Sequence, residues 1–160
     1  MEYPTAMTYS ETVTTSHPLA QRYQVLLNTA LQNEGAKRTP FTTEKCIDLD
    51  KYETDRSRGG NKGKSMDFTL GLTNKQMLLI EAKLDVKKPT NLTRGELEGK
   101  IKQSKECLLE YEIAIAKEKV FLFSTDKIGQ ARSHVSKLFN NNPNLRIWTV
   151  QELYDTIIPK

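Results

Sequence analysis

Three charged residues interrupt the apolar runs of the stretch "SMDFTLGLTNKQMLLIEAKLDV", residues 65–86. Asp67 opens the first run, and Glu81 and Lys83 follow the apolar part of the second. Acidic residues and lysine are poor strand formers, so their place in two predicted strands needs a reason. Either they are exposed positions at strand ends, or they share one face of a sheet, where two carboxylates would bind a hard divalent cation.

A hairpin centred on Asn74 favours the second explanation. If the two strands pair symmetrically about Asn74, Asp67 lies directly opposite Glu81, with Cβ atoms about 5 Å apart. Lys83 follows Glu81 by two residues and therefore points to the same face. Two like charges in this position destabilise a sheet unless a cation neutralises them, and Lys83 does so only in part.

The acidic-x-Lys spacing has little weight alone, because it recurs at residues 85–87 and 98–100. A surface charge cluster therefore remains the alternative explanation. A shift of one residue in the pairing would also move Asp67 to the other face of the sheet. The value of the pattern comes from its position at the end of an apolar strand, opposite a single Asp.

The periodicity of apolar residues predicts a mixed β-sheet flanked by helices, in the order α-β-β-β-α-β-α-β-α. The helices are expected over residues 16–35, from Thr93 through Ile115, over 128–138, and from Thr149 onward. The strands are expected over 44–52, on both sides of Asn74, over 119–124 and over 145–150.

Length and composition of the 160-residue chain fit one globular domain over positions 16–160, with residues 1–15 as a loose, Thr-rich arm. No basic segment followed by an apolar run marks a signal peptide, and no apolar run reaches the roughly 18 residues of a membrane span. With two cysteines and no disulfide framework, the chain is expected to be cytoplasmic. Its net charge of +4 allows nucleic-acid binding without requiring it.

At Met66-Asp67 and Glu81-Ala82-Lys83 the chain resembles the PD-(D/E)XK nuclease superfamily, in which an Asp and a (D/E)-x-Lys motif flank a short hairpin. Met66 replaces the first-position Pro of that motif. The predicted order of elements is also similar to the core of the family. The resemblance implies an α/β restriction-endonuclease-like fold and a metal-dependent endonuclease that hydrolyses DNA, duplex or branched.

The same resemblance implies roles for individual residues. Asp67, Glu81 and the carbonyl of Ala82 would bind Mg²⁺ or Mn²⁺, and Lys83 would orient the attacking water or neutralise the phosphate. Many members supply another carboxylate from the first helix, and Glu34 at the end of that helix is one candidate here. Some members place a glutamine facing the site from the next helix, where this chain has Gln103, although an exposed Gln explains that residue as well.

Basic residues near the motif are candidates for contact with nucleic acid: Arg56, Arg58, Lys62, Lys64, Lys87 and Lys88. The first four lie in a predicted Gly-rich loop over residues 53–65, and a solvated loop explains them as well. Cutting both strands of a duplex would require a homodimer. Two alternatives remain: a non-catalytic module that binds nucleic acid or protein on the same fold, and an unrelated mixed α/β protein.

Overall fold

The computed structural model describes residues 7–57 and 65–159 and contains one six-stranded mixed sheet with the strands in chain order. Strands β1 to β4 pair antiparallel, whereas β4, β5 and β6 pair in parallel. The strands are β1 (Gln24–Leu26), β2 (Lys45–Asp48), β3 (Phe68–Gly71), β4 (Met77–Lys83), β5 (Ile115–Phe123) and β6 (Leu145–Trp148). The expected mixed α/β architecture is confirmed.

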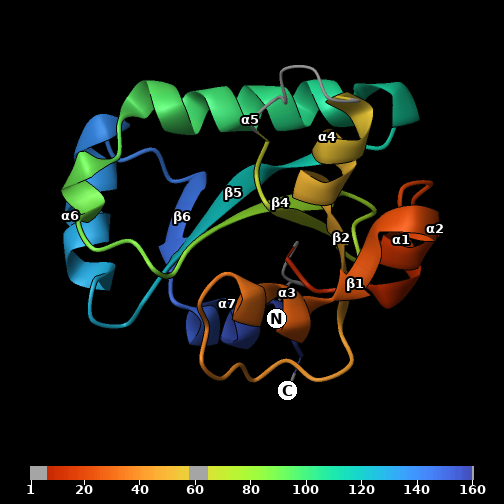
Figure 1. Ribbon diagram of the computed structural model, residues 1–160, viewed down its shortest axis with the longest axis horizontal. Coiled ribbons are helices and arrows are strands. Elements are labelled where there is room, and N and C mark those ends of the chain that lie inside the picture. The colour runs from red at the N-terminus through yellow and green to blue at the C-terminus, as the bar shows by residue number, and fades with distance from the viewer. Residues whose placement is uncertain (1–6, 58–64, 160) are drawn as a thin grey trace, which may run out of the picture.

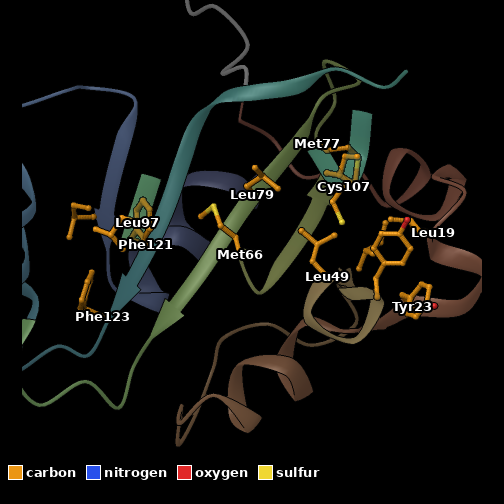
Figure 2. Packing of buried hydrophobic residues seen from close by; sticks show 14 of the residues in the cluster. Leu19, Tyr23, Leu49, Met66, Met77, Leu79, Leu97, Cys107, Phe121 and Phe123 are labelled. Atoms are coloured by element: carbon orange, nitrogen blue, oxygen red, sulfur yellow. The ribbon is translucent and has the colours of Figure 1, made fainter. Parts of the chain in front are cut away.

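Helices cover both faces of this sheet (Figure 1). They are α1 (Glu11–Ser16), α2 (Ala20–Tyr23), α3 (Leu27–Asn33), α4 (Leu49–Ser57), α5 (Arg94–Leu108), α6 (Ile128–Leu138) and α7 (Val150–Ile157), with 3₁₀ turns at Pro89–Asn91 and Leu109–Tyr111. One buried cluster packs the sheet against α2, α4, α5 and α6, and Figure 2 shows part of it. A second cluster packs the other face against α3 and α7. Within the described ranges, every helix is too short or too polar to cross a membrane.

The β3–β4 hairpin has the register that the sequence predicts. Phe68 pairs with Ile80 and Leu70 with Leu78, so the pairing is symmetric about Asn74. These four side chains belong to the cluster under α3 and α7. The alternate positions of β4 therefore face α5, and this is the face on which Glu81 and Lys83 lie.

The single helix expected over residues 16–35 is wrong. Tyr23 ends α2, and Val25 instead pairs with Cys46 in the short edge strand β1. Residues of α2 such as Tyr23 contribute to the cluster under α5, whereas Leu27 and Leu31 of α3 contribute to the cluster on the opposite face. The chain thus changes faces by passing along the sheet edge. Apolar spacing alone cannot show this crossing, because each half keeps a helical period.

The strand expected over residues 44–52 ends four residues early, at Asp48. The Asp48 side chain accepts a hydrogen bond from the Lys51 backbone N–H (2.9 Å), as an N-cap residue does. Helix α4 then replaces the end of the strand and the first part of the predicted loop over 53–65. Ile115 likewise begins β5 and is not part of α5, because α5 ends at Leu108.

Residues 7–15 pack against the sheet and do not form a loose arm. Ser10 caps α1 by accepting a hydrogen bond from the Val13 N–H (3.1 Å). The buried Thr14 accepts one from the Gly71 N–H of β3 (2.8 Å). A Cβ atom on Gly71 would lie 2.5 Å from both the Thr14 nitrogen and Val13 Cγ1. Glycine at this position therefore allows α1 to lie directly on β3.

We predict that Gly71→Ala lowers the free energy of unfolding by about 1–3 kcal/mol, because the added methyl group overpacks the α1–β3 contact. Gly99→Ala is the matched control, since a Cβ there meets nothing within 4 Å and α5 should gain about 0.5–1 kcal/mol from alanine. Urea unfolding of both variants measures the difference. Equal stability of Gly71→Ala and wild type would contradict this packing.

Candidate active site

Asp67 and Glu81 meet where the β3–β4 ladder ends. Leu72 and Gln76 form a hydrogen-bonded pair of this ladder, because the Leu72 N–H donates to the Gln76 carbonyl (2.9 Å). Hydrogen-bonded and non-hydrogen-bonded pairs alternate along an antiparallel ladder, so the Asp67–Glu81 position is of the second type. Side chains come closest in such pairs, where the Cα atoms are about 4.5 Å apart.

The surroundings of Asp67 fix its carboxylate toward β4. Its Oδ2 accepts a hydrogen bond from the Ala82 N–H (2.8 Å), and its backbone carbonyl accepts one from the Leu49 N–H at the start of α4 (3.0 Å). Burial and the negative charge of Glu81 raise the pKa of Asp67 to about 7, although the Ala82 hydrogen bond and Lys100 act in the opposite direction. The negative charge of Glu81 therefore disfavours ionisation of the neighbouring Asp67 carboxyl.

Glu81 is buried, with 1% of its surface exposed. Its Oε2 forms ion pairs with Lys100 of α5 and with Lys83, whose Nζ lies 3.3 Å away. Its Oε1 is also buried and has no hydrogen-bond partner within the described residues. A buried carboxylate oxygen without a donor is costly, so this atom is the natural ligand for a cation or a donor brought in from solution.

Lys83 is the last residue of β4 and lies on the same face as Glu81, where strand alternation predicts it. Its Nζ is 3.3 Å from Glu81 Oε2 and 3.8 Å from Glu96 Oε2, and 15% of its side chain is exposed. The ammonium group thus lies between a buried carboxylate and the first turn of α5. The Lys83 ammonium group is therefore in contact with Glu81 and still accessible from solvent.

Lys100 is a site residue that the sequence reasoning missed. It follows the buried Leu97 by three residues and precedes the buried Ser104 by four, so it points inward with them. Burial lowers the pKa of Lys100, but the charge and hydrogen bond of Glu81 more than offset this, and the pKa lies above its ordinary value. A lysine within an apolar helical stripe was the signal available in the sequence.

Ala82 is placed so that its backbone can contribute to the site. Strand alternation turns its N–H and carbonyl toward β3, where a continued ladder would pair them with Met66. The Met66 N–H donates instead to Ser104 Oγ of α5 (2.8 Å), and the Ala82 N–H donates to Asp67. The ladder therefore stops here, and the Met66 N–H does not pair with the Ala82 carbonyl.

Glu34 lies just after α3, at the residue that caps it, and is half-buried. Its pKa is raised by burial, then by the charge of Glu81, with smaller contributions from Asp50, Asp85 and Asp48. The charge of Glu81 therefore acts on Glu34. Its role as the accessory carboxylate that the resemblance implies stays a prediction.

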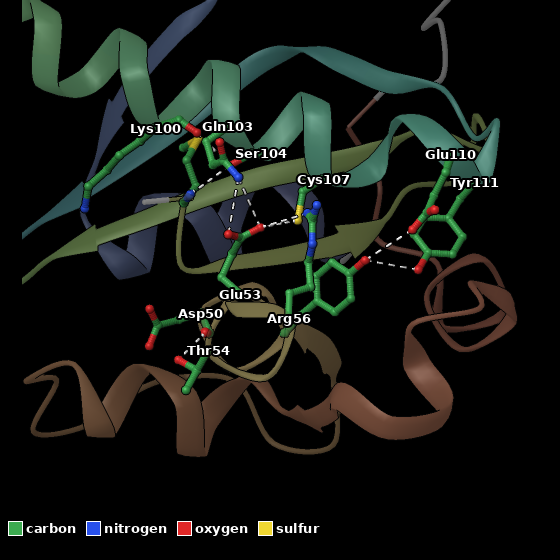
Figure 3. Close-up of polar contacts among 12 residues, drawn as sticks. Asp50, Glu53, Thr54, Arg56, Lys100, Gln103, Ser104, Cys107, Glu110 and Tyr111 are labelled. Carbon is green, nitrogen blue, oxygen red and sulfur yellow. Dashed lines mark hydrogen bonds and ion pairs between the residues drawn. The ribbon is translucent and has the colours of Figure 1, made fainter. Parts of the chain in front are cut away.

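Gln103 has a different partner from the one expected. Its Nε2 donates to both carboxylate oxygens of Glu53, at 3.4 and 3.2 Å (Figure 3). Glu53 is buried on α4 and also accepts a hydrogen bond from Cys107 Sγ (2.7 Å). This network joins α4 to α5. Sequence reasoning missed Glu53 because it assigned residues 53–65 to a loop, which has no buried face.

The predicted nucleic-acid-binding residues divide into three groups. Arg56 lies on α4, where it pairs with Glu53 (3.2 Å), and 47% of its side chain is exposed. Lys87 and Lys88 are exposed just beyond β4. Arg58, Lys62 and Lys64 lie outside the described residues.

The residues present fit a divalent cation. Within residues 7–57 and 65–159, no three His, Cys, Asp or Glu side chains gather as a ready-made metal cluster. Mg²⁺, however, is commonly held by one or two carboxylates together with substrate phosphate oxygens and water. Asp67 and Glu81 Oε1, which has no hydrogen-bond partner within the described residues, supply two hard oxygen ligands. Burial and the adjacent charge of Glu81 raise the pKa of Asp67, and a bound dication would favour the ionised form of this carboxyl.

Comparison with family models, with curated proteins and with solved structures finds no match to this chain. The functional assignment therefore depends on the geometry and chemistry of the site.

We predict that Asp67→Asn stabilises the metal-free protein at high pH. An unfolded Asp ionises near pH 3.9, whereas folded Asp67 keeps its proton to about pH 7. The folded state binds more protons in this interval, so the free energy of unfolding of the wild type falls as the pH rises from about 4 to 7. The advantage of Asp67→Asn should therefore grow by about 1–3 kcal/mol between pH 5 and pH 8.

Urea unfolding of both proteins in EDTA at the two pH values measures this change. A difference between variant and wild type that stays constant with pH would show that Asp67 is not held in a strained, partly buried position.

Proposed function

We propose that this protein is a metal-dependent nuclease of the PD-(D/E)XK type, with a restriction-endonuclease-like fold, that hydrolyses phosphodiester bonds in DNA. The observation that carries the proposal is the buried Oε1 of Glu81, which has no hydrogen-bond partner among residues 7–57 and 65–159 and lies opposite Asp67, beside two ammonium groups. Two carboxylates with adjacent lysines at a strand end are suited to binding a dication and a phosphate together.

Asp67, Glu81 and the carbonyl of Ala82 would hold Mg²⁺ or Mn²⁺. When bound, the cation would polarise the scissile phosphate and lower the pKa of a nearby water. Asp67 must lose its proton to serve as a ligand, and its pKa of about 7 allows this near neutral pH. Activity should therefore increase as the pH rises through neutrality.

Lys83 and Lys100 provide the positive charge of the site. Lys83, partly exposed, orients the attacking water and offsets the negative charge that develops on the phosphate. Lys100 reaches Glu81 from α5 and fixes the orientation of its carboxylate, which leaves Oε1 directed away from the ion pair. Burial strengthens these electrostatic contacts relative to water.

The ion pair between Glu81 and Lys100 also supports a second candidate, a nucleic-acid-binding module without catalytic activity. In that case the Lys100 ammonium replaces the metal as the counter-charge of Glu81, and the site needs no dication. DNA binding without cleavage, and without any effect of Mg²⁺ or Mn²⁺ on the melting temperature, would select this candidate.

Cleavage of labelled single-stranded, duplex and branched DNA in Mg²⁺ or Mn²⁺, with EDTA as the blank, tests the proposed activity. We predict that Glu81→Gln and Lys83→Met each reduce the rate by about 10²–10³-fold, because each removes a charge that acts on the reacting phosphate. Glu98→Gln is the control, since Glu98 is exposed on α5 and pairs with Arg94. It should retain the wild-type rate.

Cleavage that survives both Glu81→Gln and Lys83→Met would remove the assignment of this site. Size-exclusion chromatography with and without duplex DNA tests the expected homodimer in parallel.

A further inference from the structure

A crevice of about 580 Å³ opens at the carboxyl ends of the parallel strands β4, β5 and β6. It is bounded by the segment after α3, by the residues that follow β4 and β5, and by the start of α7. In open α/β sheets, ligands bind in the crevice outside the carboxyl ends of the strands. Its volume falls in the roughly 300–1,000 Å³ range of ligand sites.

The crevice is rich in positive charge. Four cationic side chains line it, Lys37, Arg38, Lys87 and Lys127, and only two carboxylates, Asp85 and Asp126. None of the four cations forms an ion pair within the described part of the chain. The first turn of α7 borders the crevice, and its capping box already places the Glu152 carboxylate at the helix N-terminus.

The two acidic residues offset only part of this charge, because four cationic side chains line the crevice with them. A hydrogen bond with Ser124 and, to a smaller extent, the charge of Lys127 lower the pKa of Asp126, so Asp126 offsets part of the charge of Lys127. Asp85 is exposed and lies beside Gly35, where an added Cβ would be 3.5 Å from the Asp85 Cβ. The net charge of the lining therefore favours a polyanion.

The crevice adjoins the candidate active site through two chain segments. Strand β4 runs from Glu81 and Lys83 directly into Leu84 and Lys87 of the lining, and four residues span at most about 14 Å. Glu34, whose pKa is raised by burial and then by the charges of Glu81, Asp50 and Asp85, precedes Gly35 of the lining. Asp67, Glu81 and Lys83 themselves do not line the crevice. The two regions thus lie side by side at one end of the sheet.

We propose that this crevice binds the sugar-phosphate backbone of the nucleic-acid strand beyond the bond that is cut. The inference rests on the proposed function, because the same strand passes the carboxylates at the end of β4. Lys37, Arg38, Lys87 and Lys127 contact successive phosphates, so binding depends on charge and on strand length and not on base sequence. Free phosphate or a single nucleotide supplies the same chemistry but can occupy only part of the lining.

Fluorescence anisotropy with labelled single-stranded and duplex oligonucleotides in EDTA tests the proposal without cleavage. The test variant is Lys37→Gln with Lys127→Gln, and the matched control is Lys75→Gln with Lys117→Gln. Both control residues are exposed near the opposite end of β4 and β5, and the change in net charge is equal. Thermal unfolding verifies that each variant is folded.

The test variant should bind about tenfold more weakly, and the slope of log K against log salt should become less negative by about 1.5 to 2, whereas the control should match the wild type. Equal affinity of test and control variants would overturn the proposal. Competition by inorganic phosphate or a mononucleotide as effective as that of an oligonucleotide would also overturn it, by assigning the crevice to a small ligand.

Failure of this proposal can be told apart from failure of the nuclease proposal. If Glu81→Gln and wild type bind oligonucleotides equally and neither cleaves them, the result supports the proposed crevice and contradicts the proposed nuclease activity. If the wild type cleaves DNA in Mn²⁺ and the double variant Lys37→Gln with Lys127→Gln has the affinity and KM of the wild type, the result supports the proposed nuclease activity and contradicts the proposed crevice.

Discussion

The repulsion between Asp67 and Glu81 is the constraint around which the other features of the site are arranged. Two like charges about 4 Å apart near a protein surface repel by about 4 kcal/mol, a large fraction of the 5–15 kcal/mol that stabilises a typical domain. The protein meets this in two ways: Asp67 keeps a proton to about pH 7, and Glu81 pairs with Lys100 and Lys83. Neither satisfies Glu81 Oε1. This buried oxygen, together with the Asp67 carboxylate once it has lost its proton, is what suits the site to a dication.

The fold keeps these groups together through contacts on both sides of the hairpin. The β3–β4 register sets the carboxylates opposite each other, and α5 brings Lys100 to Glu81 while its Ser104 Oγ ends the ladder by accepting the Met66 N–H. Glu53 ties α4 to α5 beside this point. The unfavourable repulsion between the two carboxylates is therefore confined to the end of the hairpin, and buried contacts of the surrounding helices and sheet compensate for it.

The hairpin could be predicted because its turn and its two-residue alternation are local signals, and they specify which side chains share a face. The edge strand β1 could not, because Val25 pairs with a strand about twenty residues away and its flanking helices keep an unbroken apolar period. The partners of Lys100 and Glu53 could not be predicted because each comes from another element of the fold, Glu81 of β4 for Lys100 and Gln103 of α5 for Glu53. Sequence patterns show which face a residue occupies, whereas its partners depend on packing between elements.

A crystal structure of the protein with Mn²⁺, with anomalous scattering recorded to locate the metal, tests the central claim most directly. The account predicts a metal peak between the Asp67 carboxylate and Glu81 Oε1, with the Ala82 carbonyl also facing it and Lys100 still in contact with Glu81 Oε2. Crystals at saturating Mn²⁺ that show no metal there, or that show Asp67 and Glu81 on different faces of the sheet, would contradict it.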